Sequence, residues 1–336
     1  MPGPLLHELD VQDVLQAAVP FALPLRRTFR GVDVREGMLI KGPSGWGEFA
    51  PFDDYSDVAA GRWLTSALEA SFGAWPAPVR NEIEVNAIIP AVDAADAAGL
   101  TREAVLDRGC RTVKVKVGSA SLGDDEARVA TVRDVLDTVL GRGIGTIRID
   151  ANAAWDVATA ARALRRLAAY DLEYVEQPCR TREEMRELRG LVDVAFAADE
   201  VIRTSDRPVT SVADIADVAV LKPATLGGVA ATLQRAHDLD VPVVISGSLD
   251  SSVGLETAVA AAAALPDLPF ASGLGTGALF AADVAEPLLP SAGVLPVRRT
   301  GPELPALLAA RDRLTEARAA HWRARLVAAW PHRFGS

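Results

Sequence analysis

The sequence has few cysteines and histidines, and each of these shortages argues against a class of protein. Aromatic residues are also sparse, so Ala, Val and Leu are expected to form most of the core. Cys110 and Cys179 lie far apart without metal-site spacing, so we expect neither a disulfide framework nor a zinc module. Three of the four histidines lie near the chain ends, and no G-x-S-x-G motif occurs. A histidine-based or serine-hydrolase mechanism is therefore not expected. Such sparse cysteine usage is typical of a reducing cytoplasm.

Excess positive charge and long hydrophobic runs are also absent. A formal net charge of −10 argues against nucleic-acid and membrane partners, because both are polyanions. The alanine-rich stretch 257–265 is too short to cross a bilayer, and the chain start lacks the basic and apolar pattern of a signal peptide. We expect a cytoplasmic protein in which any anionic ligand meets a local cationic pocket. The sequence leaves the oligomeric state open.

Short apolar runs recur from residue 83 onward, and most are separated by segments with helical spacing. The eight runs are residues 83–89, 112–117, 146–150, 172–176, 194–199, 218–222, 241–246 and 269–273. This alternation of strand and helix predicts an α/β fold built as a TIM-type barrel. A length of 336 residues suits such a barrel with one accessory domain.

The pattern changes at both ends of the repeat. Residues 1–80 combine mixed strands with a helical stretch near 58–72, which predicts a separate α+β domain. The barrel is expected over residues 81–284. Residues 285–336 are rich in Pro, Leu and Arg and end in a long helical run, and we expect this segment to return to the first domain.

Three acidic residues stand at the ends of successive strand-like runs. Asp150, Glu176 and Asp199 are separated by 26 and 23 residues, close to one βα unit each. The C-terminal ends of barrel strands meet on one face, so these carboxylates are expected to converge there. Three carboxylates suit a hard divalent cation such as Mg²⁺. Each acid alone would more simply cap a helix, but three in succession favour a shared site.

Lysines accompany these acids. Lys114 and Lys116 alternate with valines, so both ammonium groups are expected on one face of a buried strand. Repulsion and desolvation would lower the pKa of one lysine and make it a general base, unless the strand is an exposed edge. Lys222 comes 23 residues after Asp199, which predicts a position across the pocket. A simpler interpretation of Lys222 is a lysine at a strand end whose ammonium group reaches solvent.

Weaker candidates surround this set. Arg148 and Asn152 share the face of Asp150, and Arg148 is expected to be a buried partner of neighbouring carboxylates. The segment 273–278 matches a dinucleotide-binding pattern, but no βαβ unit follows it, so we do not expect nicotinamide binding. Backbone N–H groups of this segment and of residues 246–248 could instead hold a substrate carboxylate. The resulting substrate-binding candidates are Arg148, Asn152, Ser246, Gly247 and Gly273.

As a set, these motifs resemble the enolase superfamily, in its muconate-lactonizing-type subgroup. The resemblance implies an α+β capping domain, a modified (β/α)7β barrel and a C-terminal return to the cap. It also implies that Asp150, Glu176 and Asp199 bind Mg²⁺, with Mn²⁺ as an alternative. Lys116 would then remove a proton α to a carboxylate, Lys114 would tune it, and Lys222 would act on the opposite face.

Within the subgroup, residues 21–31, 45–55 and 148–152 resemble the o-succinylbenzoate synthase family of menaquinone biosynthesis. This resemblance implies Mg²⁺-dependent syn-dehydration of a small carboxylate, 2-succinyl-6-hydroxy-2,4-cyclohexadiene-1-carboxylate, to 2-succinylbenzoate through an enediolate. It also implies that a cap arginine, Arg26, Arg27 or Arg30, meets the succinyl carboxylate or closes over the site.

Other readings stay open at this point. The chain could instead be an N-acylamino acid racemase, or another racemase or cycloisomerase of the superfamily. A racemase would use Lys116 and Lys222 as bases on the two faces of the α-carbon. A dipeptide epimerase is less favoured, because residues 269–277 lack an Asp-x-Asp motif. A non-catalytic scaffold is not expected, since every metal and lysine position of the family pattern is present.

Overall fold

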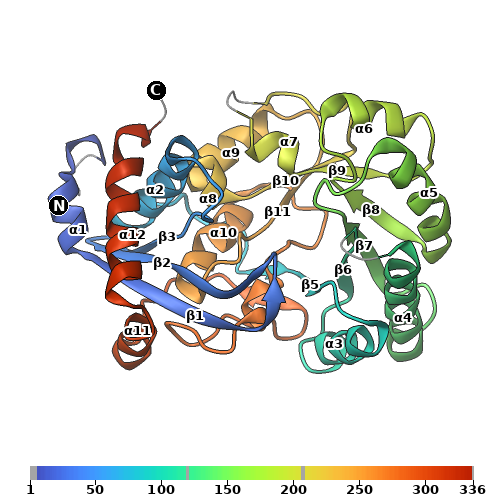
Figure 1. The fold of residues 1–336 in the computed structure, drawn as a ribbon, viewed down its shortest axis with the longest axis horizontal. Coiled ribbons are helices and arrows are strands. Elements are labelled where there is room, and N and C mark those ends of the chain that lie inside the picture. The colour runs from blue at the N-terminus through green and yellow to red at the C-terminus, as the bar shows by residue number, and fades with distance from the viewer. Residues whose placement is uncertain (1–5, 119–120, 206–208, 335–336) are drawn as a thin grey trace.

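The computed structural model describes residues 6–118, 121–205 and 209–334. A cap of antiparallel strands and helices lies beside a parallel barrel, and both chain ends lie on the cap side (Figure 1). Within the described residues, no helix is long and apolar enough to cross a membrane. The predicted α/β architecture of a capping domain and a TIM-type barrel is confirmed.

The cap is built on a three-stranded antiparallel sheet, β1 (Ala18–Phe29), β2 (Val32–Gly42) and β3 (Gly45–Phe49). The predicted helix near 58–72 is α2 (Asp57–Phe72), which begins where the Ser56 side chain accepts a hydrogen bond from the Ala59 N–H. The sheet approaches α2 so closely that a Cβ at Gly47 would lie 2.0 Å from the Ala67 carbonyl oxygen. The chain starts with η1 (Leu6–Glu8) and α1 (Val11–Gln16).

The barrel is a seven-stranded sheet in which neighbouring strands are parallel. In order its strands are β5 (Asn86–Ile89), β6 (Thr112–Lys116), β7 (Thr146–Asp150), β8 (Leu172–Glu176), β9 (Phe196–Ala198), β10 (Val218–Leu221) and β11 (Val243–Ile245). The eighth predicted run forms isolated bridges rather than a strand. Ser272 bridges Val85 and Gly273 bridges Ser246, so this segment closes the barrel between its edge strands.

The first predicted run divides between two sheets. Its beginning is β4 (Glu82–Glu84), which pairs antiparallel with β12 (Val294–Pro296), and only its end enters the barrel. The barrel helices and turns are α3 (Ala94–Leu106), α4 (Leu122–Leu140), α5 (Val157–Leu167), η2 (Ala168–Tyr170), α6 (Arg182–Arg189), α7 (Glu200–Arg203), α8 (Pro223–Leu226), α9 (Val229–Asp238), α10 (Ser252–Ala264) and η3 (Gly275–Leu279).

The long helical run predicted at the C-terminus is interrupted. It forms α11 (Leu304–Arg311), α12 (Glu316–Ala329) and η4 (Trp330–His332), and the break precedes Thr315, whose side chain caps α12. Both helices pack on the cap, where Leu307 and Trp322 join its hydrophobic core (Figure 1). The domain boundaries at 80/81 and 284/285 stay predictions.

Candidate active site

Three of the four lysines of the chain lie around one small cavity at the C-terminal ends of the barrel strands. Lys114 and Lys116 project from β6, and Lys222 directly follows β10. The cavity measures about 30 Å³, and all three side chains are largely buried. Lys41, the remaining lysine, is exposed on β2.

The register of the strands brings the three predicted acids to the same end of the barrel. Asp150 pairs with Lys116 on one side and with Glu176 on the other, and Asp199 follows β9, the next strand. Each of the three carboxylates is at most 1% exposed. Burying charged groups is costly unless they are paired, so this arrangement requires partners for every carboxylate.

The lysines supply those partners. Lys116 Nζ lies 2.5 Å from Asp150 Oδ2, and Lys114 Nζ lies 2.9 Å from Glu176 Oε2. Lys222 Nζ lies 2.6 Å from Asp199 Oδ2, across the site. The sequence therefore predicted which residues meet, although the direct lysine–carboxylate pairing was not predicted.

The pKa values of the two lysines of β6 shift in opposite directions. Burial is the largest influence on both, and it lowers the pKa of Lys116, with the neighbouring Lys114 charge adding to the effect. Burial also opposes charge on Lys114, but the Glu176 and Asp150 carboxylates outweigh it and raise the pKa of that lysine. Of this pair, Lys116 is thus the better general base.

The three carboxyl groups also differ in the direction of their pKa shifts. Burial disfavours ionisation of Asp150 and Asp199, yet Lys116 and Lys222 respectively overcome it and lower the pKa of each acid. Burial raises the pKa of Glu176, and the nearby Asp150 charge adds to the rise. An added positive charge would favour ionised Glu176.

Sequence reasoning missed Glu200 and Arg203, which complete this polar cluster. Arg203 contacts Asp199 at 3.1 Å and Glu200 at 2.5 Å, and Asn152 Nδ2 donates to Glu200 Oε1 at 3.3 Å. Among the described residues, one oxygen of Glu176 and one of Glu200 are buried without a hydrogen-bond partner. In the described part of the chain, no three acidic, histidine or cysteine side chains group as a ready metal site, and each predicted ligand faces a cationic side chain.

The predicted substrate-binding residues take different positions. Asn152, Ser246 and Gly247 line the cavity with the lysines. Gly273 lies beside it, and its carbonyl oxygen accepts the Gly247 N–H at 3.0 Å, so that N–H already has a partner. Arg148 is fully buried against Glu173, Asn86 and the Ala271 carbonyl and does not line the cavity. Substrate contacts for these residues stay predictions.

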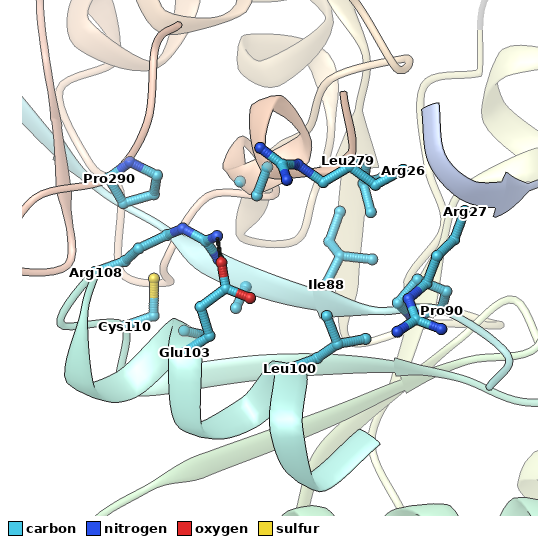
Figure 2. Close-up of a pocket in the computed structure, with 14 residues that line it drawn as sticks. Arg26, Arg27, Ile88, Pro90, Leu100, Glu103, Arg108, Cys110, Leu279 and Pro290 are labelled. Atoms are coloured by element: carbon cyan, nitrogen blue, oxygen red, sulfur yellow. Dashed lines mark hydrogen bonds and ion pairs between the residues drawn. The ribbon is translucent and has the colours of Figure 1, made fainter. Parts of the chain in front are cut away.

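Arg26 lies in a separate cavity of about 350 Å³ (Figure 2). Its Nε donates to the Phe280 carbonyl oxygen at 2.9 Å, and Arg108 faces Glu103 on the opposite wall. Ile88 of β5 borders both this cavity and the lysine cavity. The predicted contact of Arg26 with the substrate therefore stays a prediction.

Arg30 is the cap arginine that borders the lysine cavity. It forms the β1–β2 turn with Gly31, and both have positive φ angles, as tight hairpins require. Another cavity, of about 420 Å³, adjoins the lysine cavity and shares Phe29, Arg30, Lys116 and Asn152 with it. The lysine cavity and this adjoining cavity together provide space for a substrate larger than the lysine cavity alone could hold.

Comparisons with known proteins agree with this geometry. Residues 20–71 match the enolase N-terminal domain-like model, and residues 96–302 match the enolase C-terminal domain-like model. The structure of muconate lactonizing enzyme from Pseudomonas fluorescens, complexed with muconolactone, aligns with a TM-score of 0.70 at 22% identity, over 91% of this chain and 97% of that one. The fold and the site define a member of the enolase superfamily.

Closer relatives narrow the assignment. The o-succinylbenzoate synthase of Thermobifida fusca is 49% identical over 92% of this chain and 94% of its own length. That of Mycolicibacterium smegmatis is 48% identical over 89% and 91%, respectively. The chain belongs to the o-succinylbenzoate synthase family.

Proposed function

We propose that this protein is an o-succinylbenzoate synthase, a hydro-lyase of menaquinone biosynthesis. Relatives of that name, about half identical along nearly the whole chain, carry this assignment. The substrate is 2-succinyl-6-hydroxy-2,4-cyclohexadiene-1-carboxylate, which loses water to give 2-succinylbenzoate. The cysteine usage further supports a cytoplasmic location.

Lys116 is the proposed base. It takes the proton next to the ring carboxylate, and the electron pair moves into an enediolate. The β-hydroxyl group then leaves on the same face, and Lys116 returns its proton to that leaving group, so that water is released. The lowered pKa of Lys116 supports this role, because a neutral amine is needed at the start. Formation of the aromatic ring supplies the driving force.

Lys114 and Lys222 are proposed to stabilise the dianionic enediolate. Both ammonium groups border the cavity, and fixed positive charges in a water-poor site stabilise developing negative charge strongly. Lys114 suits this role because its pKa is raised. Lys222 lies on the opposite side, next to Asp199.

The acids fit a divalent cation chemically, and we propose that Asp150, Glu176 and Asp199 hold Mg²⁺, with Mn²⁺ as an alternative. Three buried carboxylates at adjacent strand ends form an oxygen-rich set, and one oxygen of Glu176 lacks any partner. When bound, the cation would supply further positive charge for the substrate carboxylate. The lysines that now face these acids would then be free to turn toward the substrate.

The succinyl group is proposed to extend into the adjoining cavity. Arg30 borders both cavities and is exposed, so its guanidinium is available to a second carboxylate. The small-molecule partner is therefore a dicarboxylate.

A racemase is the second candidate, because Lys116 and Lys222 approach the cavity from different strands. The test is a Mg²⁺-dependent ultraviolet assay of dehydration, run beside N-succinylamino acids in D₂O followed by NMR. Efficient dehydration establishes the synthase. Rapid α-deuterium exchange without dehydration would instead identify a racemase or epimerase.

A further inference from the structure

A strained loop forms one wall of the lysine cavity. Ser246, Gly247, Ser248 and Leu249, which follow β11, all line it. Leu249 has a φ of +63°, a conformation that residues with a side chain seldom adopt. Such strain persists only where surrounding contacts impose it. The loop therefore needs a support outside itself.

The cap provides that support through Arg35. This residue of β2 is 3% exposed, and its Nε donates to the Leu249 carbonyl oxygen at 2.9 Å. A terminal guanidinium nitrogen donates to the Ala50 carbonyl oxygen, and the guanidinium stacks over Phe52 at 4.2 Å from the ring centroid. The Leu249 side chain itself packs into the hydrophobic core of the cap. One buried arginine thus ties the strained residue to the cap.

Glu48 of β3 holds the far end of the loop. Its Oε2 accepts the Ser251 N–H at 3.0 Å and also the Ser251 hydroxyl. The fit is tight, because a Cβ at Gly254 would lie 2.6 Å from the Glu48 carboxyl group. Within the loop, Asp250 Oδ2 accepts the Ser248 N–H at 2.7 Å.

These contacts place an unused hydrogen-bonding group at the cavity. The Ser248 hydroxyl is buried and finds no hydrogen-bond partner among the residues that the structure describes, although the Ser248 N–H is held by Asp250. Ser248 is 6% exposed and directly precedes the strained Leu249. A buried hydroxyl without a protein partner is unfavourable unless water or a ligand satisfies it.

We propose that Ser248 binds a substrate oxygen and that Arg35 and Glu48 are positioning residues, which hold the loop so that this hydroxyl faces the cavity. The proposal rests on the proposed function for the identity of the substrate. The cap then contributes to substrate affinity from β2 and β3, through residues that do not line the lysine cavity.

The experiment compares Arg35→Met, Arg35→Lys and Ser248→Ala with wild type. A matched control is Arg80→Met, because Arg80 also donates to two carbonyl oxygens, those of Ala262 and Pro266, near the other end of α10. We measure kcat and KM for dehydration, together with hydrogen–deuterium exchange of residues 246–251. Arg35→Lys keeps the buried positive charge next to Glu48 but cannot reproduce the forked geometry, so it tests the same contact if Arg35→Met does not fold.

Arg35→Met and Arg35→Lys are expected to raise KM about tenfold or more, with kcat changed less than about threefold, because a lost hydrogen bond to bound substrate weakens uniform binding. Exchange of residues 246–251 should become faster in both. Ser248→Ala should raise KM without changing this exchange, and Arg80→Met should alter neither quantity.

Unchanged exchange at 246–251 in a folded Arg35 variant would overturn the positioning role, whatever reaction the protein catalyses. An unchanged KM in Ser248→Ala would overturn the substrate contact. If wild type does not dehydrate the cyclohexadiene, the proposed function fails, and faster loop exchange in the Arg35 variants still supports the positioning role.

Discussion

Lys116 offers the most direct test of the chemistry at the scale of single residues. Lys116→Ala is expected to lower kcat for dehydration by about 10²–10⁴-fold, because the proposed general base is lost. The protein should still fold, because Lys114 Nζ lies 3.6 Å from Asp150 Oδ2 and still pairs with that buried carboxylate. The ultraviolet assay measures the effect, with exposed Lys41→Ala as the matched control. Full activity in Lys116→Ala would contradict the mechanism.

Glu256 is expected to make folding stability depend on pH. Burial raises its pKa from 4.5 to about 7, although Thr300 donates two hydrogen bonds to it. In the unfolded chain the carboxyl ionises first, so its contribution is fully present below about pH 4.5 and is lost as the pH rises through about 7. The shift corresponds to at most about 3 kcal/mol.

Glu256→Gln should therefore unfold at a higher temperature than wild type at pH 8, and at a similar temperature at pH 4.5. Thermal unfolding at several pH values measures this difference. Glu183→Gln, on the exposed side of α6, is the control and should follow wild type at each pH. The account of Glu256 is wrong if the gap between the two proteins does not widen as the pH rises.

At the scale of elements, two glycines should respond to alanine in opposite ways. Gly47 in β3 faces the Ala67 carbonyl oxygen of α2, so a methyl group there must push the cap sheet off its helix. Gly99 in α3 has open space around its Cβ position. Gly47→Ala should destabilise the protein by about 1–3 kcal/mol through overpacking, and Gly99→Ala should stabilise it by about 0.5–1 kcal/mol.

Chemical denaturation of both alanine variants gives these changes in unfolding free energy. Each variant controls for the other, because the substitution is the same. Equal effects would mean that the close contact between β3 and α2 does not limit cap packing.

Metal binding should stabilise the molecule as a whole. After treatment with a chelator, addition of Mg²⁺ is expected to raise the unfolding temperature by a few degrees, because a cation that binds only the folded state stabilises it by about 2.7 kcal/mol at 100 times its Kd. Asp199→Asn should lose most of this Mg²⁺-dependent rise, whereas the exposed Asp312→Asn should keep it. No rise in wild type at saturating Mg²⁺ would argue against the proposed metal site.

The whole molecule also shows what a sequence can predict. Alternation along β6 and the βα repeat are local properties, so Lys114, Lys116 and the three acids could be placed before the structure was known. The absence of a regular strand in the eighth predicted run could not be foreseen, because Ser272 and Gly273 form single bridges to distant segments, at Val85 and Ser246 respectively. Contacts between the cap and the barrel likewise join residues that lie far apart in the sequence. Arg35 lies 214 residues from Leu249, and no local pattern relates them.

The distribution of lysines has a practical consequence. Lys114, Lys116 and Lys222 are shielded within the cavity, so Lys41 of β2 is the lysine that amine-reactive reagents can reach readily. A dye or surface linker that targets lysine side chains should therefore attach predominantly at one point of the cap. Such a conjugate would keep the three amines of the proposed site unmodified.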